Sequence, residues 1–510
     1  MGGFVSPIFA SMPSNDPQGL SRRQFLGTTA RWMLATGVVA QLPWLSGCGG
    51  GGGEARALPT SAWDDLARGF SGTVLRPGAA GFDLAAQPNN LRYNDRRPLG
   101  IARCLTVEDV QKSILWSRQN GLPLVARSGG HSYAGFSTTE GLMIDVSQMN
   151  GVGFNEAGQA VTGGGARNRD VFDALANTGM AVTHGRCYGV GVAGLVLGGG
   201  IGFDMRKHGL TCDHLVETTM VTASGEILKL SETENKELFW ACRGAGGGNY
   251  GIHTSFTFEP YAVSTAVAFN LTWETRLEEV LAALLPALEA APDEFGAKLS
   301  VIPARPGTSD KIRINLLGQH FGTVTEFRDI LASVYAIAAP SEEVDDLPYW
   351  PAQKKLTEEG GPEYYHERSR FVEQSFSEAA LDTIWAGVRN WPGTSEGASF
   401  KVFQSGGAVN RRSPNDMAFV HRSALYVMSV AVLWSEHDSV DLLRQNLNWQ
   451  DEFYDAMRPF TGPGAYQNFI DPSLDDWQQA YYGENFSRLV AAKRAVDPDN
   501  VFHYAQSIPV

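Results

Sequence analysis

A glycine-dense stretch from Gly185 to Phe203 constrains the fold of this chain more than any other feature. It carries eight glycines among apolar residues, and a single cysteine, Cys187, stands near its start. Glycine has no side chain and reaches positive φ freely, so a backbone built from it can press closely on a flat or anionic ligand. The pattern predicts a cofactor cradle with a reactive thiol at its edge. The alternative interpretation is a tight loop between two buried strands.

A second segment supplies a partner for this cradle. The apolar run Leu124 to Arg127 predicts a strand, and Ser128-Gly129-Gly130-His131 follows it directly. Consecutive backbone N–H groups at such a strand end can converge on phosphate oxygens. The Gly-x-Gly-x-x-Gly spacing of a Rossmann fingerprint is missing from this strand end, so the sequence predicts a phosphate-binding loop of another type.

These two stretches resemble the berberine bridge enzyme-like group of FAD-linked oxidases, which belongs to the vanillyl-alcohol oxidase and p-cresol methylhydroxylase superfamily. The resemblance rests on Arg-Ser-Gly-Gly-His-Ser-Tyr at 127–133 and on Gly-x-Cys-x-x-Val-Gly-x-x-Gly-x-x-x-Gly-Gly-Gly at 185–200. It implies that His131 bonds to the flavin 8α carbon and that Cys187 bonds to flavin C6. Imidazole and thiolate are the nucleophiles suited to those electrophilic positions. On their own, these residues would be interpreted as a loop histidine and a small buried hydrophobe.

The resemblance also implies which residues contact FAD. A further glycine-rich segment, Leu238 to Gly251, matches the family and is expected near the adenosine and pyrophosphate end, with Ile252 close behind. The alternative is a plain glycine loop beside a strand. The expected cofactor-binding residues are Arg127, Ser128, Gly129, Gly130, His131, Ser132, Ser137, Cys187, Val190, Gly191, Gly194, Leu197, Gly200, Ile201, Ile252, Tyr466 and Asn468.

The expected fold class is α+β, with a two-part FAD-binding domain of the vanillyl-alcohol oxidase type and a substrate domain with an antiparallel sheet backed by helices. The resemblance returns after the middle of the chain in Ala465-Tyr466-Gln467-Asn468-Phe469 and continues to Ile508, so the FAD-binding domain is expected to close discontinuously. The expected divisions are a signal peptide at 1–47, a glycine-rich linker at 48–60, the FAD-binding domain at 61–261 and 455–510, and the substrate domain at 262–454.

Local patterns place several elements. Thr106 and Asp109 form a capping-box pattern that predicts a helix running toward Gly121. Residues 142–146 predict a buried strand, and Ser224-Gly225 predicts the turn of a hairpin. In the middle of the chain, the apolar periodicity predicts helices over 275–288 and 324–338 and strands over 311–316 and 424–430.

The family position of Tyr466 makes it the expected catalytic base, which removes a hydroxyl proton while hydride leaves for the flavin. A tyrosine that merely stacks on the ring is the alternative. An unperturbed tyrosine has a pKa of about 10, so Tyr133, Gln404 or a pocket arginine is expected to lower it. Gln404 and Asn410 are candidate substrate contacts, and solvated loop positions are the competing interpretation. Ile201 stands where the plant alcohol-oxidising members have a tyrosine, which argues against a plant monolignol-type site.

The expected function is oxidation of an alcohol or hemiacetal, from a carbohydrate or a small aromatic metabolite, with transfer of the electrons to molecular oxygen and formation of hydrogen peroxide. In the family, a valine at the position of Val190 goes with an open cavity beside flavin C4a and so with oxygen as the acceptor; Val192 could close that space instead. Oxidative cyclisation of a natural product, a periplasmic dehydrogenase with another acceptor, and a binding role with a vestigial flavin are the alternatives.

The N-terminus predicts export. Ser21-Arg22-Arg23-Gln24-Phe25-Leu26 resembles a twin-arginine signal, and Leu45-Ser46-Gly47-Cys48 resembles a lipobox with Cys48 as the lipidated residue. We therefore expect a periplasmic or extracellular enzyme whose contact with a membrane is a lipid anchor at Cys48. The alternative is ordinary cleavage near Gly47, which would release a soluble product.

Charge and cysteine content exclude other classes. The formal net charge of the 510 residues is −14 without a basic stripe, which argues against nucleic acid as a partner. Five cysteines are too few for a disulfide scaffold, and Cys104, Cys212 and Cys242 are expected as buried free thiols, with one disulfide among them as the alternative. No Cys/His cluster has zinc-site spacing, so no metal is expected.

Overall fold

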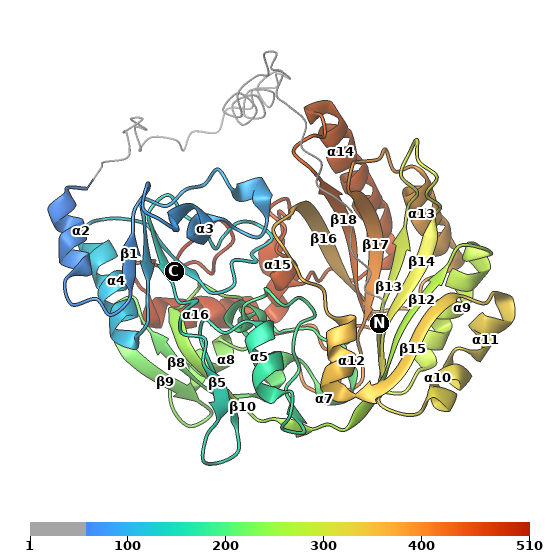
Figure 1. The fold of residues 1–510 in the computed structure, drawn as a ribbon, viewed down its shortest axis with the longest axis horizontal. Coiled ribbons are helices and arrows are strands. Elements are labelled where there is room, and N and C mark those ends of the chain that lie inside the picture. The colour runs from blue at the N-terminus through green and yellow to red at the C-terminus, as the bar shows by residue number, and fades with distance from the viewer. Residues whose placement is uncertain (1–57) are drawn as a thin grey trace, which may run out of the picture. The chain divides into compact units, whose positions relative to one another are not determined.

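The computed structural model describes residues 58–510, and its fold is drawn in Figure 1. The twin-arginine motif, the lipobox and Cys48 lie outside the described residues. Among residues 58–510, no helix is long and apolar enough to cross a membrane.

The first part of the described chain folds around a four-stranded sheet in the order β1-β2-β4-β3. Strands β2, β4 and β3 run parallel, and helix α4 connects β2 to β3. The predicted capping box is present, because the Thr106 side chain accepts from the Asp109 N–H and the Asp109 side chain accepts from the Thr106 N–H. The elements of this part are α2 (Thr60–Ala67), β1 (Thr73–Leu75), α3 (Phe82–Ala86), the 3₁₀ helix η1 (Leu91–Tyr93), β2 (Gly100–Arg103), α4 (Val107–Gln119), β3 (Leu124–Arg127) and β4 (Leu142–Asp145).

A five-stranded antiparallel sheet follows, in the order β5-β6-β10-β8-β9. The predicted hairpin joins β8 to β9, and Gly225 adopts a φ of 83° in its turn, a conformation that favours glycine. The elements are β5 (Val152–Phe154), β6 (Ala160–Gly163), α5 (Asn168–Leu175), β7 (Met180–Ala181), α6 (Val192–Leu197), α7 (Met205–His208), η2 (Thr211–His214), β8 (Leu215–Val221), β9 (Ile227–Ser231), α8 (Lys236–Ala241), β10 (Ile252–Phe258) and β11 (Tyr261–Ala262).

The alternative interpretation of the glycine-dense stretch, a tight loop between two strands, is wrong because the stretch contains a helix. Helix α6 occupies its middle, and its N-cap, Gly191, has an extended backbone. The segment then continues through Gly198-Gly199-Gly200 toward α7. Since Val192 and Val196 are buried while a Cβ on Gly194 would meet no atom within 4 Å, α6 packs one face into the core and presents Gly194 on the other.

A seven-stranded antiparallel sheet, in the order β15-β12-β14-β13-β17-β18-β16, forms the middle of the chain. One of its faces shares a buried core with α9, α10, α11, α13 and α14, and Figure 1 shows these helices on the side away from the glycine-rich part. The predicted helix over 324–338 is two helices, α10 and α11, joined at Leu331. The elements are β12 (Thr265–Trp273), α9 (Leu277–Ala290), β13 (Phe295–Ile302), β14 (Arg313–His320), α10 (Val324–Ile330), α11 (Ala332–Ile337), β15 (Ser341–Pro348), α12 (Tyr349–Leu356), β16 (Tyr364–Val372), α13 (Glu378–Arg389), β17 (Gly397–Gln404), β18 (Tyr426–Trp434) and α14 (Val440–Met457).

The C-terminal segment packs on the glycine-rich part. Its elements are η3 (Arg458–Phe460), η4 (Gln467–Phe469), α15 (Trp477–Tyr482), η5 (Gly483–Asn485) and α16 (Phe486–Val496). Tyr466, Tyr481 and Leu489 belong to the same hydrophobic core as α6 and β10. Mixed helices and antiparallel sheets in two parts confirm the expected α+β class.

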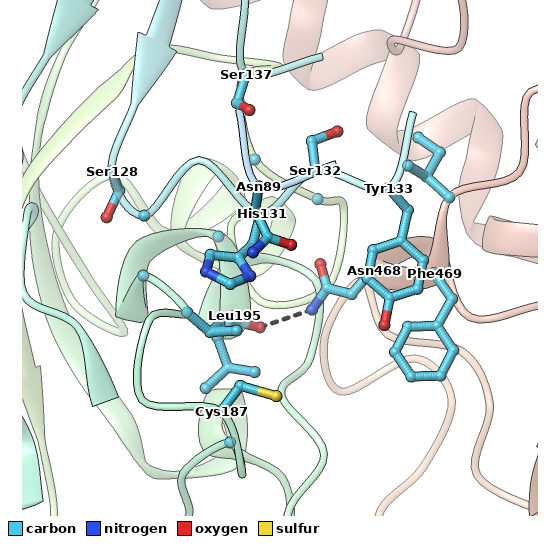
Figure 2. A pocket seen from close by; sticks show the side chains of 18 of the residues that line it. Asn89, Ser128, His131, Ser132, Tyr133, Ser137, Cys187, Leu195, Asn468 and Phe469 are labelled. Carbon is cyan, nitrogen blue, oxygen red and sulfur yellow. Dashed lines mark hydrogen bonds between the residues drawn. The ribbon is translucent and has the colours of Figure 1, made fainter. Parts of the chain in front are cut away.

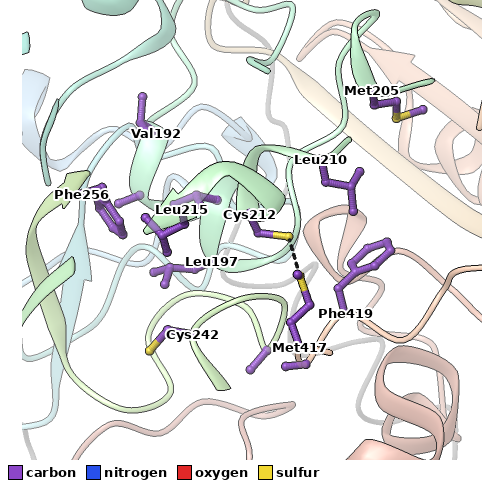
Figure 3. Packing of buried hydrophobic residues seen from close by; sticks show 14 of the residues in the cluster. Val192, Leu197, Met205, Leu210, Cys212, Leu215, Cys242, Phe256, Met417 and Phe419 are labelled. Atoms are coloured by element: carbon purple, nitrogen blue, oxygen red, sulfur yellow. Dashed lines mark hydrogen bonds between the residues drawn. The ribbon is translucent and has the colours of Figure 1, made fainter. Parts of the chain in front are cut away.

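Cys104, Cys212 and Cys242 are free and buried, which confirms the default prediction and excludes a disulfide among them. Figure 3 shows Cys212 and Cys242 within the apolar cluster, where the Cys212 Sγ lies 3.6 Å from the Met417 Sδ.

Candidate active site

A cavity of about 780 Å³ lies between the glycine-rich loops and the seven-stranded sheet. It is on the face of the sheet opposite the helices α9, α10, α11, α13 and α14. Glycine loops form one wall, the sheet forms another, and the C-terminal segment closes the end. The lining comes from stretches at 124–137, 185–205, 246–253, 358–367, 401–404, 466–470 and 502–504.

Backbones cross closely at one side of this cavity. A Cβ added to Gly129 would lie 2.2 Å from the Gly191 nitrogen, and a Cβ on Gly191 would lie 2.4 Å from both the Gly129 nitrogen and the Ser128 Oγ. Real Cβ atoms do not approach that closely, so only glycine fits at either position. The two predicted segments therefore build one continuous cradle.

Two hydroxyl groups in this cradle lack a hydrogen-bond partner. The hydroxyl oxygens of Ser128 and Ser137 are buried and have no hydrogen-bond partner among residues 58–510. Buried hydroxyls are normally hydrogen-bonded, so these two are suited to ligand phosphate or ribityl oxygens. Figure 2 shows Ser128, Ser132 and Ser137 above His131.

Arg127 differs from the prediction. It does not line the cavity, because its guanidinium donates to the carbonyls of Ala85, Gln87 and Ser137. Arginine has no acceptor and five donors, so it can tie several carbonyls together. Arg127 holds the loop in shape rather than contacting the ligand.

His131 and Cys187 meet at one end of the cradle. A Cβ on Gly360 would lie 3.6 Å from the His131 Cε1 and 3.7 Å from the Cys187 Sγ, so both side chains share this glycine as a neighbour. Burial, followed by the positive charge of Arg167, lowers the pKa of His131 to about 4. The imidazole is therefore neutral near pH 7 and keeps a nitrogen lone pair.

Burial also favours the neutral form of the Cys187 thiol. Burial raises its pKa, and the charge of Arg186 opposes that shift only in part. The Glu358 Oε2 lies 3.8 Å from the Cys187 Sγ, and the Glu358 Oε1 lies 2.7 Å from Arg186 and 3.1 Å from Lys298. Sequence reasoning missed Glu358, which is 171 residues away from Cys187 along the chain.

Tyr466 is buried, and its phenol oxygen accepts two hydrogen bonds. The Gly200 N–H donates to it at 3.1 Å and the Asn468 Nδ2 at 3.0 Å. Asn468 is itself oriented by the Leu195 carbonyl, as the dashed line in Figure 2 shows. Burial raises the pKa of Tyr466 to about 12, and the hydrogen bonds from Asn468, Gly200 and Ile201 oppose that rise.

Two expected residues have a different role from the one predicted. Gly200 supports Tyr466 through its N–H and does not line the cavity. Gln404 lines the cavity, but its Nε2 donates to the Leu288 carbonyl, so the groups that stabilise a phenolate at Tyr466 are Asn468 and the loop amides.

Asn410 does not line the cavity either. Its Nδ2 donates to the Ala424 carbonyl at 3.0 Å, in the turn beyond the end of β17. The direction of a turn after a strand is set by what the turn packs on, which the local sequence does not encode. The structure therefore removes Asn410 from the candidate substrate contacts.

Aromatic rings cover the end of the cavity near Tyr466. Tyr133 stacks on Phe469 with ring centroids 4.9 Å apart and an interplanar angle of 5°, and Tyr365 meets Tyr133 edge-on at 5.0 Å. Phe403 meets Phe469 at 5.7 Å. These flat apolar surfaces are suited to a planar or sugar ring.

The sheet face of the cavity carries an ion pair that sequence reasoning missed. The Lys401 Nζ lies 3.2 Å from the Glu367 Oε1, which also accepts from the Ser429 hydroxyl at 2.6 Å. Lys401 pairs with Ser429 across β17 and β18. The sequence did contain a clue to this pair, because Glu367 lies within the segment that forms the buried strand β16. An acidic residue in a buried strand requires a partner.

The remaining expected residues surround the same space. Ser128, Gly129, Gly130, His131, Ser132, Tyr133, Ser137, Cys187, Val190, Gly191, Gly194, Leu197, Ile201, Ile252, Gln404, Tyr466 and Asn468 all line it. A cavity of this size with a glycine cradle, unpartnered hydroxyls and a neutral imidazole fits FAD. Among residues 58–510, no group of three His, Cys, Asp or Glu side chains could hold a metal ion.

Comparisons with known proteins agree with this geometry. A family model described as "FAD binding domain" matches residues 98–231, and one described as "Berberine and berberine like" matches residues 465–509. The uncharacterized FAD-linked oxidoreductase YgaK of Bacillus subtilis is 33% identical over 425 residues, which cover 81% of this chain and 92% of that protein.

Solved structures are similar over nearly the same span. Physcomitrella patens BBE-like 1 is 28% identical with a TM-score of 0.80, covering 88% of this chain and 99% of that chain. Glucooligosaccharide oxidase from Acremonium strictum, whose structure carries a 6-S-cysteinyl, 8α-N1-histidyl FAD, is 25% identical with a TM-score of 0.77 and the same coverage of both chains.

Proposed function

This chain belongs to the berberine bridge enzyme-like family of FAD-linked oxidoreductases, and we propose that it is an oxidase that acts on a CH–OH carbon of an alcohol or hemiacetal. Bound FAD would accept the hydride and pass two electrons to molecular oxygen, which gives hydrogen peroxide. The observation that carries the proposal is the phenol of Tyr466 in the cavity wall, with two donors directed at its oxygen.

In this proposal, Tyr466 takes the hydroxyl proton of the substrate. Donors aimed at the phenol oxygen stabilise its ionised form, and they come from a backbone amide and an oriented asparagine that need not move during the reaction. The resting phenol is protonated near pH 7 because burial holds its pKa at about 12. The rate should therefore rise with pH as the phenolate fraction grows.

We place the cofactor across the cradle, with covalent attachment through His131 and Cys187. The neutral imidazole of His131 and the thiol of Cys187 share Gly360 as a neighbour, and the relative from Acremonium strictum carries FAD through a histidine and a cysteine. The unpartnered hydroxyls of Ser128 and Ser137 would then receive hydrogen-bonding groups of the dinucleotide.

The substrate would enter against the sheet face. The paired charges of Glu367 and Lys401 offer one acceptor and one donor side by side with no net charge, and Tyr133 and Phe469 offer a stacking surface. An uncharged polyhydroxyl or hydroxyaromatic molecule satisfies both features.

Molecular oxygen is the proposed acceptor. Val190 lines the cavity, while Val192, the alternative obstruction, is buried in the core at 4% exposure. A valine leaves more room than leucine or isoleucine at that wall. The twin-arginine pattern supports a further proposal, that the enzyme is exported with FAD already bound.

Oxygen uptake by the purified protein tests the proposed function. Sugars, oligosaccharides and aromatic alcohols are supplied separately, and we expect at least one to consume oxygen with one hydrogen peroxide formed per oxygen. Acid-precipitated protein should stay yellow, because the FAD is covalently held. Substrates that reduce a dye but consume no oxygen would contradict the choice of acceptor, and a colourless precipitate would contradict covalent attachment.

A further inference from the structure

The carboxylate of Glu358 is held against the Cys187 thiol by the main chain. The Glu358 N–H donates to the Arg186 carbonyl at 3.1 Å, and the Tyr188 N–H donates to the Glu358 carbonyl at 3.0 Å. Glu358 and Cys187 thus form a two-residue parallel bridge. The 3.8 Å separation of the Oε2 and Sγ atoms follows from this backbone pairing.

Glu358 stays ionised, so it does not act as the base for this thiol. The positive charge of Arg186 outweighs the cost of burial, and with Lys298 it holds the pKa of Glu358 well below its usual range. A carboxylate in that state accepts a proton poorly. Its influence on Cys187 is electrostatic, because a negative charge 3.8 Å from sulfur disfavours the thiolate.

The two attachment residues consequently differ in whether they must lose a proton before they can act as nucleophiles. His131 is neutral and needs no deprotonation to expose a lone pair, whereas the nucleophile at Cys187 is the thiolate. We propose that Glu358 times the attachment of FAD: its negative charge, added to the effect of burial, keeps the Cys187 thiol neutral, so that the bond to His131 forms first and the bond to Cys187 second. This inference rests on the bicovalent attachment proposed above.

In the first step, the His131 imidazole nitrogen would bond to the 8α carbon, and the imidazole N–H and one 8α C–H would each lose a proton. In the second step, the Cys187 thiol would lose its proton, its sulfur would bond to a ring carbon of FAD, and that carbon would lose its hydrogen as a proton. Each step would leave two electrons on FAD, which would pass with the two released protons to molecular oxygen and give hydrogen peroxide. A thiolate formed before FAD is in place would instead be open to oxidation, so a delayed thiol is protected while the cradle fills.

Charged and titratable groups surround the thiol from several elements. Arg186 precedes it, Glu358 comes from the loop after α12, Lys298 lies on β13 and Lys401 on β17. The side chains that act on or adjoin Cys187 are Arg186, Glu358, Lys298, Lys401, Tyr133, Tyr365 and His131. Because the three cations favour the thiolate and Glu358 opposes them, removing Glu358 and removing Lys298 should act in opposite directions.

Alkylation by iodoacetamide tests this without FAD. Full-length protein from riboflavin-starved cells is treated between pH 6 and 10, and modification of Cys187 is followed by peptide mapping. Glu358→Gln should shift the midpoint to lower pH and speed alkylation near neutral pH about threefold for each unit by which the thiol pKa falls. Lys298→Gln should shift the midpoint to higher pH. Glu359→Gln, on the same loop and paired with Arg169, is the matched control and should match the wild type.

Two results would overturn the inference: an unchanged or slower Cys187 in Glu358→Gln, or shifts in the same direction for Glu358→Gln and Lys298→Gln, which would indicate a merely structural effect. Modification of buried Cys104, Cys212 or Cys242 would reveal a misfolded variant, and Lys298→Gln then remains as an independent arm.

Addition of FAD to the same proteins tests the order of the bonds. In the wild type, the peptide linked through His131 should accumulate before the doubly linked species, and Glu358→Gln should shorten that interval. Formation of the Cys187 bond first would refute the order. Absence of any covalent FAD would refute the proposed attachment instead, and the alkylation experiment would still report on Glu358.

Discussion

At the scale of single residues, the chemistry of this site depends on how each side chain is solvated. Tyr466 is buried at 1% exposure and would be an inert phenol without the amide of Gly200 and the side chain of Asn468. Burial also keeps His131 neutral. The same loss of water thus favours the neutral form of both side chains.

Replacing Tyr466 by phenylalanine removes the phenol and keeps the ring. We expect kcat to fall about 10²–10⁴-fold, the usual contribution of a general base. Wild-type kcat/KM should rise with pH between 6 and 9, because the pKa of about 12 lies above that range, and the variant should lose the slope. Tyr454→Phe is the control, since its phenol is buried away from the cavity. An unchanged pH profile in Tyr466→Phe would exclude this residue as the base.

Val190→Leu adds one methylene at the cavity wall. If oxygen reacts in the space beside Val190, filling it should slow reoxidation of the reduced enzyme by about tenfold, corresponding to ~1.4 kcal/mol. Reduction by substrate should change little. Stopped-flow measurement of both half-reactions checks this, and equal reoxidation rates would show that Val190 does not control access.

At the scale of elements, two glycine segments that are far apart in sequence become one binding surface because neither has a side chain where they cross. Gly129 follows β3, and Gly191 is the N-cap of α6. Their contact brings the end of the parallel sheet to the N-terminus of α6. The cradle therefore depends on packing between backbones rather than on any single loop.

Gly129→Ala should disrupt this contact. The new Cβ would meet the Gly191 nitrogen at 2.2 Å, and backbone atoms on both sides cannot yield cheaply. We expect a loss of about 3 kcal/mol and protein with little bound FAD, measured by thermal unfolding and by flavin absorbance. Gly153→Ala in β5 has no heavy atom within 4 Å of its Cβ and should change stability by less than ~1 kcal/mol. Equal behaviour of the two variants would contradict the crossing argument.

At the scale of the whole molecule, buried polar contacts tie the seven-stranded sheet to the C-terminal segment. The Arg368 Nε on β16 lies 2.7 Å from the Asp471 Oδ2, and both side chains are buried. Burial opposes ionisation of Asp471, but the hydrogen bond from His366 and the charge of Arg368 outweigh it and lower its pKa to about 2. Tyr466 belongs to the same C-terminal segment, so this pair also helps to hold that wall of the cavity.

Asp471→Asn should destabilise the protein by about 2–3 kcal/mol at pH 7, because Arg368 loses its buried partner and keeps only the half-exposed Asp451. The folded-state pKa of Asp471 is depressed, so its contribution is present above pH 4 and is lost as the pH falls toward 2. The difference from the wild type should shrink accordingly in denaturation measured at pH 7 and pH 3. Asp451, the other partner of Arg368, has a side chain that is 52% exposed. Asp451→Asn should therefore lower the free energy of unfolding by less than ~1 kcal/mol. Equal losses in both variants would contradict the assignment.

The export proposal is tested in cells. Replacing Arg22 and Arg23 by lysine should retain folded, FAD-containing protein inside, because lysine lacks the planar fork of arginine. Cell fractionation with flavin absorbance checks this, and Arg31→Lys serves as the control. Unimpaired export of the Arg22/Arg23 variant would exclude the twin-arginine route, and detergent partitioning unaffected by Cys48→Ser would exclude a lipid anchor.

The sequence by itself determined the cradle and its two nucleophiles. Glycine patterns, a lone cysteine and a histidine after a strand are local signals, and a backbone that approaches a ligand closely needs glycine wherever it does so. The capping box of α4 and the turn at Gly225 were readable for the same reason, since the residues involved are a few positions apart.

Only the tertiary structure decided which charged and amide side chains line the cavity beside that cradle. Glu358, Glu367 and Lys401 line the cavity from a loop and two strands, and each forms an ion pair with a residue distant in the chain. Asn410 and Arg127 fitted the family positions, yet their side chains are used by nearby carbonyls. A charged or amide side chain looks alike in sequence whether it faces a ligand or a carbonyl, and its role follows from which groups folding leaves unpaired beside it.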